Sequence, residues 1–171
     1  MHGLDTLQRM VRYKAWSNDE LLAALKRLDD GGYLRGRLIL RTARRVLNHT
    51  YVVDQIFAAN LKRMEHGYKS ANTAQLPKLE DLSEAIRSSD RWYLDYVAGL
   101  DQAQLAESID FSFSNGAPGR MTREEMLMHI AMHGDYHRGQ VGLLLTKNPI
   151  GFSAAPFTGY LHKAEALERR R

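Results

Sequence analysis

Seven histidines occur in a sequence that contains no cysteine, and three of them, His129, His133 and His137, follow one another at intervals of four residues. Residues spaced by four lie on one face of an α-helix, so this run stacks imidazoles along that face. Neutral imidazole is the commonest protein ligand for metals. The lack of cysteine excludes thiolate ligands, a disulfide framework and a cysteine nucleophile. The run therefore supplies candidate metal ligands, although this spacing alone also occurs by chance on many helices.

The angular positions of the histidines predict which of them face the interior. At about 100° per residue, His133 and His137 fall within the apolar stripe of their helix, whereas His129 falls at its boundary. The stripe consists of Met126, Leu127, Ile130, Val141, Leu144 and Leu145. His49 falls within the apolar stripe of an earlier segment, which consists of Ile39, Val46, Val53, Ile56 and Phe57. Two helices are therefore expected to turn histidines toward a common interior.

Buried imidazoles need partners for their ring nitrogens. An unpaired buried group costs about 1–3 kcal/mol, and a divalent cation bound by one nitrogen of each ring removes that cost. We therefore predict a metal site formed by His49, His133 and His137. A set in which His129 replaces His137 is the alternative. Because a lone buried histidine is more often a core residue with a satisfied hydrogen bond, the prediction depends on the three together.

Three neutral imidazoles leave a divalent cation with its full charge and with at least one coordination position for water or substrate, which is the pattern of a catalytic site. Such a cation lowers the pKa of a bound water or binds a thiol as thiolate. Because the chain has no cysteine, a thiol nucleophile would come from a cosubstrate. We expect a metal-dependent transferase or hydrolase that acts on a small molecule. The alternative is a metal-binding module without catalysis.

Polar residues around the run have more than one interpretation. Gln140 could support the metal site from behind or serve as a helix-packing amide. Arg138 points away from the site and is expected to pair with a carboxylate on a neighbouring segment, and Asp135 is expected in solvent. His66 and His162 have no partners at useful spacing, so we expect both at the surface.

Four segments with helical periodicity must position these residues. They span residues 5–28, 37–67, 79–100 and 122–147, and a shorter helix is predicted at 160–167. The fourth segment begins with the capping-box sequence Thr122-Arg-Glu-Glu125. A similar sequence, Ser17-Asn-Asp-Glu20, allows a kink or restart within the first segment.

The region between the third and fourth segments has a different pattern. Ile109, Phe111 and Phe113 alternate with polar residues before the turn dipeptide Asn115-Gly116, which predicts a short hairpin or an ordered loop. The fold class is therefore all-α, a four-helix bundle with this hairpin or loop between helices 3 and 4. The longer connection before the third segment permits a crossover.

Composition bounds the remaining possibilities. The 171 residues fit one domain, 1–171, and no apolar run approaches the roughly 20 residues that span a bilayer. Because the N-terminus also lacks the features of a signal peptide, we expect a cytoplasmic protein without a membrane partner. The net charge is +4, partly from a tail at 169–171, expected to fray, and partly from Arg35, Arg37, Arg41, Arg44 and Arg45. Nucleic-acid binding through this basic face is a second alternative, although the face lacks interleaved aromatics.

Three motifs resemble those of the DinB/YfiT-like family. His133-Gly-Asp-Tyr-His137-Arg-Gly-Gln140 is similar to the HxxxHRGQ signature of its last helix, and Leu47-Asn-His49 is similar to its helix-two histidine. Tyr13-Lys-Ala-Trp-Ser-Asn18 is similar to its first-helix pattern, with serine in place of the usual alanine. The match covers nearly the whole chain in order, and the last-helix signature is its specific part.

The resemblance implies a four-helix bundle with an up-down-down-up course that is often a homodimer. It implies one divalent metal ion, usually zinc or nickel, held by His49, His133 and His137, with His129 as an additional histidine beyond the motif. Some relatives are thiol S-transferases that use a low-molecular-weight thiol, others resemble hydrolases of thiol conjugates, and many have no established activity. The implied partners are a small-molecule substrate and a second copy of the chain.

Overall fold

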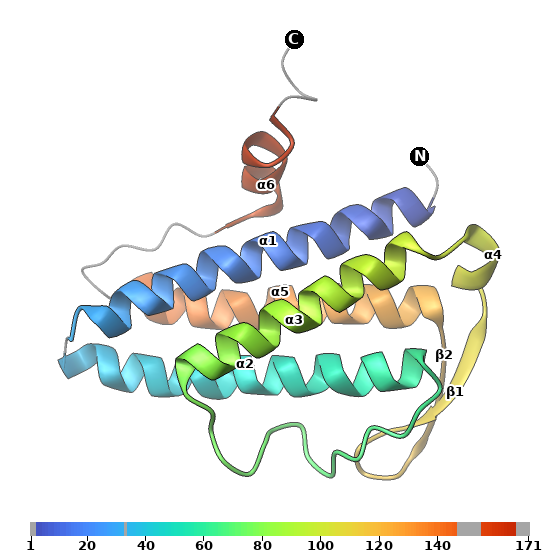
Figure 1. Ribbon diagram of the computed structural model, residues 1–171, viewed down its shortest axis with the longest axis horizontal. Helices are drawn as coiled ribbons and strands as arrows, with labels where there is room; N and C mark the ends of the chain where they lie inside the picture. Colours follow the sequence, from blue (N-terminus) through green and yellow to red (C-terminus); the bar gives the residue numbers. More distant parts are fainter. Residues whose placement is uncertain (1–2, 33, 147–154, 167–171) are drawn as a thin grey trace.

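The computed structural model describes residues 3–32, 34–146 and 155–166 (Figure 1). The long helices are α1 (Gly3–Asp30), α2 (Leu34–Leu61), α3 (Leu79–Ala98) and α5 (Arg123–Thr146). The shorter elements are α4 (Gln102–Leu105), α6 (Phe157–Lys163), β1 (Ser108–Ser112) and β2 (Pro118–Thr122). The predicted all-α fold is confirmed, and the small sheet lies between α3 and α5 in the chain. None of the described helices is both long and apolar enough to cross a membrane.

The four long helices follow the predicted up-down-down-up course. α1 and α5 run in one direction and α2 and α3 in the other (Figure 1). The principal contacts around the bundle follow the order α1, α3, α2, α5, and α5 closes the ring against α1. Because α2 and α3 are parallel, the connection at 62–78 returns along the bundle before α3 begins. This course makes α2 and α5 antiparallel neighbours, which is the pairing that the predicted metal site requires.

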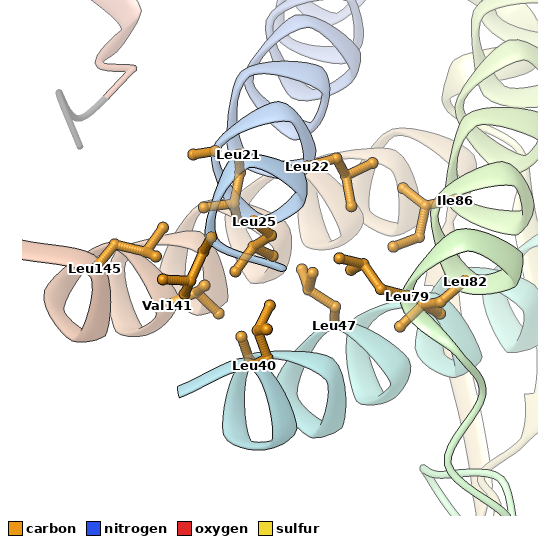
Figure 2. Close-up of a cluster of buried hydrophobic side chains, with 13 residues drawn as sticks. Leu21, Leu22, Leu25, Leu40, Leu47, Leu79, Leu82, Ile86, Val141 and Leu145 are labelled. Atoms are coloured by element: carbon orange, nitrogen blue, oxygen red, sulfur yellow. The ribbon is translucent and has the colours of Figure 1, made fainter. Parts of the chain in front are cut away.

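The apolar core is divided into two clusters along the bundle. Figure 2 shows the first, where side chains from four helices converge: Leu21, Leu22, Leu25, Leu40, Leu47, Leu79, Leu82, Ile86, Val141 and Leu145. The second joins the opposite halves of the same helices and includes Leu7, Val11, Phe57, Leu61, Tyr93, Val97, Met126, Leu127 and Ile130. Buried polar residues occupy the positions between the clusters: Lys14, Ser17, Asn18, Asn48, Thr50, Asp54, Ser89, Asp90 and Arg138. The middle of the bundle is therefore a polar cross-section between two apolar ends.

Helix α2 is shorter than its periodicity predicts. It ends at Leu61 instead of near Gly67. Arg63 adopts a left-handed conformation with a φ of 57°, and the amide of Met64 donates back to the carbonyl of Ala59 at 2.9 Å. This reversal closes the last turn of the helix and frees the following residues to form the long connection.

Helix α1 is continuous through the sequence that allowed a restart. Instead of capping a new helix, the Ser17 hydroxyl donates to the carbonyls of Tyr13 at 2.8 Å and Lys14 at 3.1 Å within the same helix. The capping box at the start of α5 is confirmed, because the side chains of Thr122 and Glu125 each accept from the other's backbone amide. Only the second of the two similar sequences therefore begins a helix.

The segment before α5 forms the predicted hairpin. β1 and β2 pair antiparallel, and Gly116 at the turn has a φ of 83°, as the Asn115-Gly116 dipeptide predicts. The ring of Phe111 lies over Gly119, where a Cβ atom would come within 2.6 Å of it. Glycine at this position therefore lets the aromatic ring cover the opposite strand.

The C-terminal helix is displaced from its predicted bounds. α6 spans Phe157–Lys163, whereas the periodicity predicts 160–167. Pro156 precedes its first turn, which suits proline because a first-turn amide has no partner within the helix. The predicted end at Leu167 and the basic tail at 169–171 lie outside the described residues.

Candidate metal centre

The three predicted ligands lie at the middle of the antiparallel pair α2 and α5. His49 is on α2, and His133 and His137 are one turn apart on α5. All three side chains are half-buried and lie at the level of the polar cross-section. The structure therefore brings together the three histidines that helical geometry selected.

The Nε2 atoms of the three rings converge. Nε2 of His133 is 3.2 Å from that of His49 and 3.0 Å from that of His137, and one ligand atom from each ring lies within 4.8 Å of the others. Tetrahedral coordination at about 2.0–2.1 Å places neighbouring nitrogens roughly 3.3 Å apart. The observed spacing is therefore that of nitrogens which could share one divalent ion.

Two of the rings are oriented by hydrogen bonds on their far sides. Nδ1 of His49 is 2.9 Å from the carbonyl oxygen of Ala71, and Nδ1 of His137 is 2.8 Å from Oε1 of Gln140. A carbonyl oxygen can only accept, so Nδ1 carries the proton and Nε2 presents its lone pair. Metal-binding histidines usually have such a support. Of the two roles considered for Gln140, its position matches support of the candidate metal site.

The long connection between α2 and α3 supplies the carbonyl that supports His49. Asn48, next to that histidine, donates to the side-chain oxygen of Asn72 at 3.1 Å and accepts from the hydroxyl of Thr73 at 3.1 Å. These bonds fasten the connection to α2 beside Ala71. The path of residues 62–78 is therefore part of the site, which the helical pattern of the sequence did not indicate.

The site favours the neutral forms of His133 and His137. Burial lowers the pKa of His133 to about 3, with smaller contributions from the neighbouring rings of His137 and His49. Burial also lowers the pKa of His137, against the effect of its bond to Gln140. Neutral imidazole is the form that binds metal. Nδ1 of His133 is buried without a hydrogen-bond partner among the described residues.

His129 lies beside the three converging histidines and does not complete the alternative set. Its ring stacks on Phe57, with centroids 4.6 Å apart, and on His133 at 5.4 Å. Burial lowers its pKa. Within the described parts of the chain, the group with metal-site spacing contains His49, His133 and His137 and not His129. His129 and Phe57 therefore form an aromatic wall next to the site.

The buried face of α5 differs from the predicted apolar stripe. Gly134 and Arg138 are buried, whereas Leu144 is half-buried. A Cβ atom at Gly134 would lie 3.0 Å from the Arg138 guanidinium and 3.5 Å from the Lys14 stem, so glycine makes room for these charged side chains. Glycine and arginine add nothing to a hydrophobic pattern. The true buried face is therefore rotated away from the histidines, which lie at its edge.

The surroundings of Arg138 correct the expected pairing. Its guanidinium donates to the amide oxygen of Asn18 on α1 at 3.1 Å and to Asp135 on its own helix at 3.2 Å. Among the described residues, it pairs with no carboxylate on another segment. Asp135 is exposed as expected, but it also accepts from the hydroxyl of Tyr13 at 2.9 Å. These bonds join α5 to α1 on the side away from the metal centre.

An ionic layer within the polar cross-section escaped the sequence analysis. It consists of Lys14, Asn18, Asp54, Asp90 and Arg138, which are all buried and come from all four long helices. The Lys14 ammonium donates to Asp54 at 2.7 Å and to Asp90 at 2.6 Å. In the sequence, Lys14 and Asp90 resemble the solvated charges of any amphipathic helix. A lysine in phase with Val11 and Leu21 on α1 was the available signal.

The two remaining histidines of the prediction lie away from the site. His66 donates through Nε2 to the Ser112 carbonyl and accepts at Nδ1 from the amide of Tyr68, so it joins the long connection to β1. His162 is exposed on α6 and donates to the Thr158 carbonyl within that helix. His66 is half-buried and has hydrogen-bond partners on the connection and on β1. Residue spacing along one helix cannot indicate such partners.

A sizeable surface cavity lies away from the three convergent histidines. This cavity, with a volume of about 860 Å³, lies between the ends of α1, α2 and α3. Leu22, Leu40 and Leu79 form part of its lining, and none of the three histidines contributes to it. The candidate site is therefore the group of convergent imidazole nitrogens, because these atoms can bind a metal ion and the cavity contains none of them.

Fold and site together define a class: an up-down-down-up helical bundle in which three histidines of the antiparallel pair could hold a metal ion. The sequence profile of the DinB family matches residues 4–166, and the chain belongs to this family. Protein DinB of Bacillus subtilis (strain 168) is 25% identical over 159 residues, which cover 86% of this chain and 88% of that protein. No solved structure matches the chain significantly.

Proposed function

We propose that the protein is a metal-dependent enzyme whose reaction takes place at the three-histidine centre. The reaction would be either transfer of a thiol to a small molecule or hydrolysis of a small molecule. The convergence of the Nε2 atoms of His49, His133 and His137 carries the proposal. The donor set fits a borderline ion such as zinc or nickel, because all three donors are imidazole nitrogens. When bound, the ion would supply Lewis-acid chemistry that activates a thiol or a water as nucleophile.

The chain's own residues would hold and orient this centre. Three neutral ligands leave the positive charge of the ion undiminished, and half-buried rings leave one side accessible to a reactant. Ala71 and Gln140 hold two of the rings from behind. The exposed ring of His129, stacked on the buried ring of Phe57, offers an aromatic surface beside the ion for the body of the substrate.

The proposal includes the partners of the reaction. Because the chain has no cysteine, the thiol would be a low-molecular-weight cosubstrate, and the cytoplasm is the compartment in which such thiols are abundant. We also propose that the protein acts as a homodimer. A sedimentation measurement would check the homodimer independently of the reaction.

Metal analysis of purified variants tests the centre. We expect one zinc or nickel ion per chain in the wild type and at least about a hundredfold weaker binding in His133→Ala, which removes the nitrogen shared by both short distances. His129→Ala is the matched control, because it removes an imidazole one turn away on the same helix. Equal losses in the two variants would contradict the assignment of ligands.

Activity assays then separate catalysis from binding alone. Wild-type protein is screened for thiol transfer to small electrophiles and for hydrolysis of thiol conjugates, with several low-molecular-weight thiols and with a chelator in parallel. Turnover that the chelator abolishes and His133→Ala lacks supports the enzyme. A stoichiometric metal with no turnover in any assay would support a non-catalytic metal-binding module.

A further inference from the structure

The ionic layer links α2 to α5 by direct bonds that run through α1. Asp54 on α2 accepts from Lys14 on α1 at 2.7 Å. One turn along α1, Asn18 accepts from Arg138 on α5 at 3.1 Å. Lys14 and Asn18 also bind the two oxygens of Asp90 on α3, at 2.6 and 2.8 Å. Four helices are therefore held at one axial level by a continuous network.

The network reaches α2 and α5 close to the candidate metal ligands. Asp54 lies five residues after His49 on α2, and Arg138 directly follows His137 on α5. The Lys14 stem would lie within 3.5 Å of a Cβ atom at Gly134, the neighbour of His133. A shift of α2 along α5 by one turn would move His49 about 5.4 Å past its partners and would break the links through α1 as well.

Stability alone does not explain the layer. Replacing a buried ion pair by apolar residues of similar volume is often neutral or stabilising, because taking charges out of water is costly. Here the cost is visible, since Oδ1 of Asp54 is buried without a hydrogen-bond partner among the described residues. Apolar side chains pack against one another in several registers, whereas this network is satisfied in one. The layer is therefore suited to fixing the relative positions of helices.

We propose that Lys14, with Asn18, Asp54, Asp90 and Arg138, is a positioning network that fixes the register of α2 against α5, so that the three imidazoles already converge before an ion binds. The inference rests on the proposed metal centre. Convergence in advance spares the ion the cost of ordering the helices. The layer would thus contribute to metal affinity without touching the metal.

An apolar replacement of the layer tests this role. In Lys14→Met/Asp54→Leu/Asp90→Leu the side chains keep similar volumes, and the buried charges of these three residues are removed together. Arg138 keeps its bonds to Asn18 and Asp135. We expect a folded protein whose zinc affinity, measured by competition with a chromophoric chelator, is at least tenfold weaker. Cobalt substituted for zinc should show an altered visible spectrum. Leu25→Ala is the matched control, because it weakens the apolar cluster without cutting the network, and it should keep wild-type affinity and spectrum.

The outcomes separate this role from the proposed function. If the wild type binds no zinc, the metal centre is refuted and the positioning role falls with it. If the wild type binds zinc and the folded layer variant binds it equally well, only the positioning role is refuted. Should the triple variant fail to fold, Asn18→Leu cuts the link to Arg138 while leaving the Lys14 ion pairs. It should weaken zinc binding several-fold, and unchanged binding would overturn the proposal.

Discussion

The histidine centre and the ionic layer occupy the same cross-section of the bundle but satisfy their polar atoms in opposite ways. The centre lies between α2 and α5, is half-buried, and gathers three imidazole rings whose Nε2 atoms converge. The layer lies in the interior between the four long helices and pairs full charges, and Lys14 is only 1% exposed. In the layer, by contrast, nearly every polar side-chain atom has a partner among the described residues.

This difference indicates a division of labour. A site that binds and releases ligands needs access to solvent and donors that are not consumed by the protein. A network that fixes helix positions needs burial and internal partners, because exposed ion pairs contribute little. The bundle provides both at one level, with α5 contributing His133 and His137 toward one side and Arg138 toward the other.

The largest expected effect comes from removing the cation of the layer alone. Lys14→Met leaves Asp54 and Asp90 buried without their ammonium partner, which should lower the free energy of unfolding by about 3–5 kcal/mol. Urea denaturation measures this change. Lys26→Met removes the exposed pair with Asp30 and should change the free energy of unfolding little, because solvent screens that pair. Equal costs for the two variants would show that burial does not distinguish the layer.

A substitution in the centre should change metal affinity, whereas a substitution in the layer changes stability. Gln140→Leu removes the oxygen that holds Nδ1 of His137, and loss of such a support typically weakens metal binding by about 10–100-fold. Gln140→Glu keeps an acceptor at the same distance and should retain or strengthen binding. Because Gln140 is exposed, neither variant should change urea stability much. Competition with a chelator measures the affinities, and equal binding by the two variants would exclude the supporting role.

The same comparison explains what could be predicted from the sequence. Apolar periodicity predicted the four helices, and the four-residue spacing with an in-phase His49 predicted the trio, because both signals are local to a helix. The layer was missed because Lys14 and Asp90 are ordinary helix-surface residues until a third helix covers them. The sequence Ser17-Asn18 is also compatible with a helix start, whereas in the structure Asn18 links α1 to α3 and α5. Nor does a helical wheel show that residues 62–78 return to support His49.

The smallest expected effect is a pH dependence of stability. It decides whether burial or pairing with Lys14 has the larger influence on the pKa of Asp54. Burial raises the pKa of this carboxyl to about 6 from 3.8, against the opposing effect of Lys14. A folded-state pKa above the unfolded one stabilises the protein below pH 3.8, and that contribution is lost as the pH rises through about 6. The unfolding free energy of the wild type, measured relative to Asp54→Asn, should therefore fall by about 2 kcal/mol between pH 4 and pH 7.

The direction of this pH trend carries the argument, because the rival outcome has the opposite sign. If the Lys14 ammonium dominated, the pKa of Asp54 would be lowered, and the wild type would gain stability relative to Asp54→Asn as the pH rises. Lys14 does not confuse the measurement, since its own pKa is raised above 10.5 and it stays charged throughout the range. Asp110→Asn, on the exposed face of the hairpin, is the control for general charge effects. A falling trend would show that the layer retains Asp54 at a cost in stability, as expected of residues kept for position.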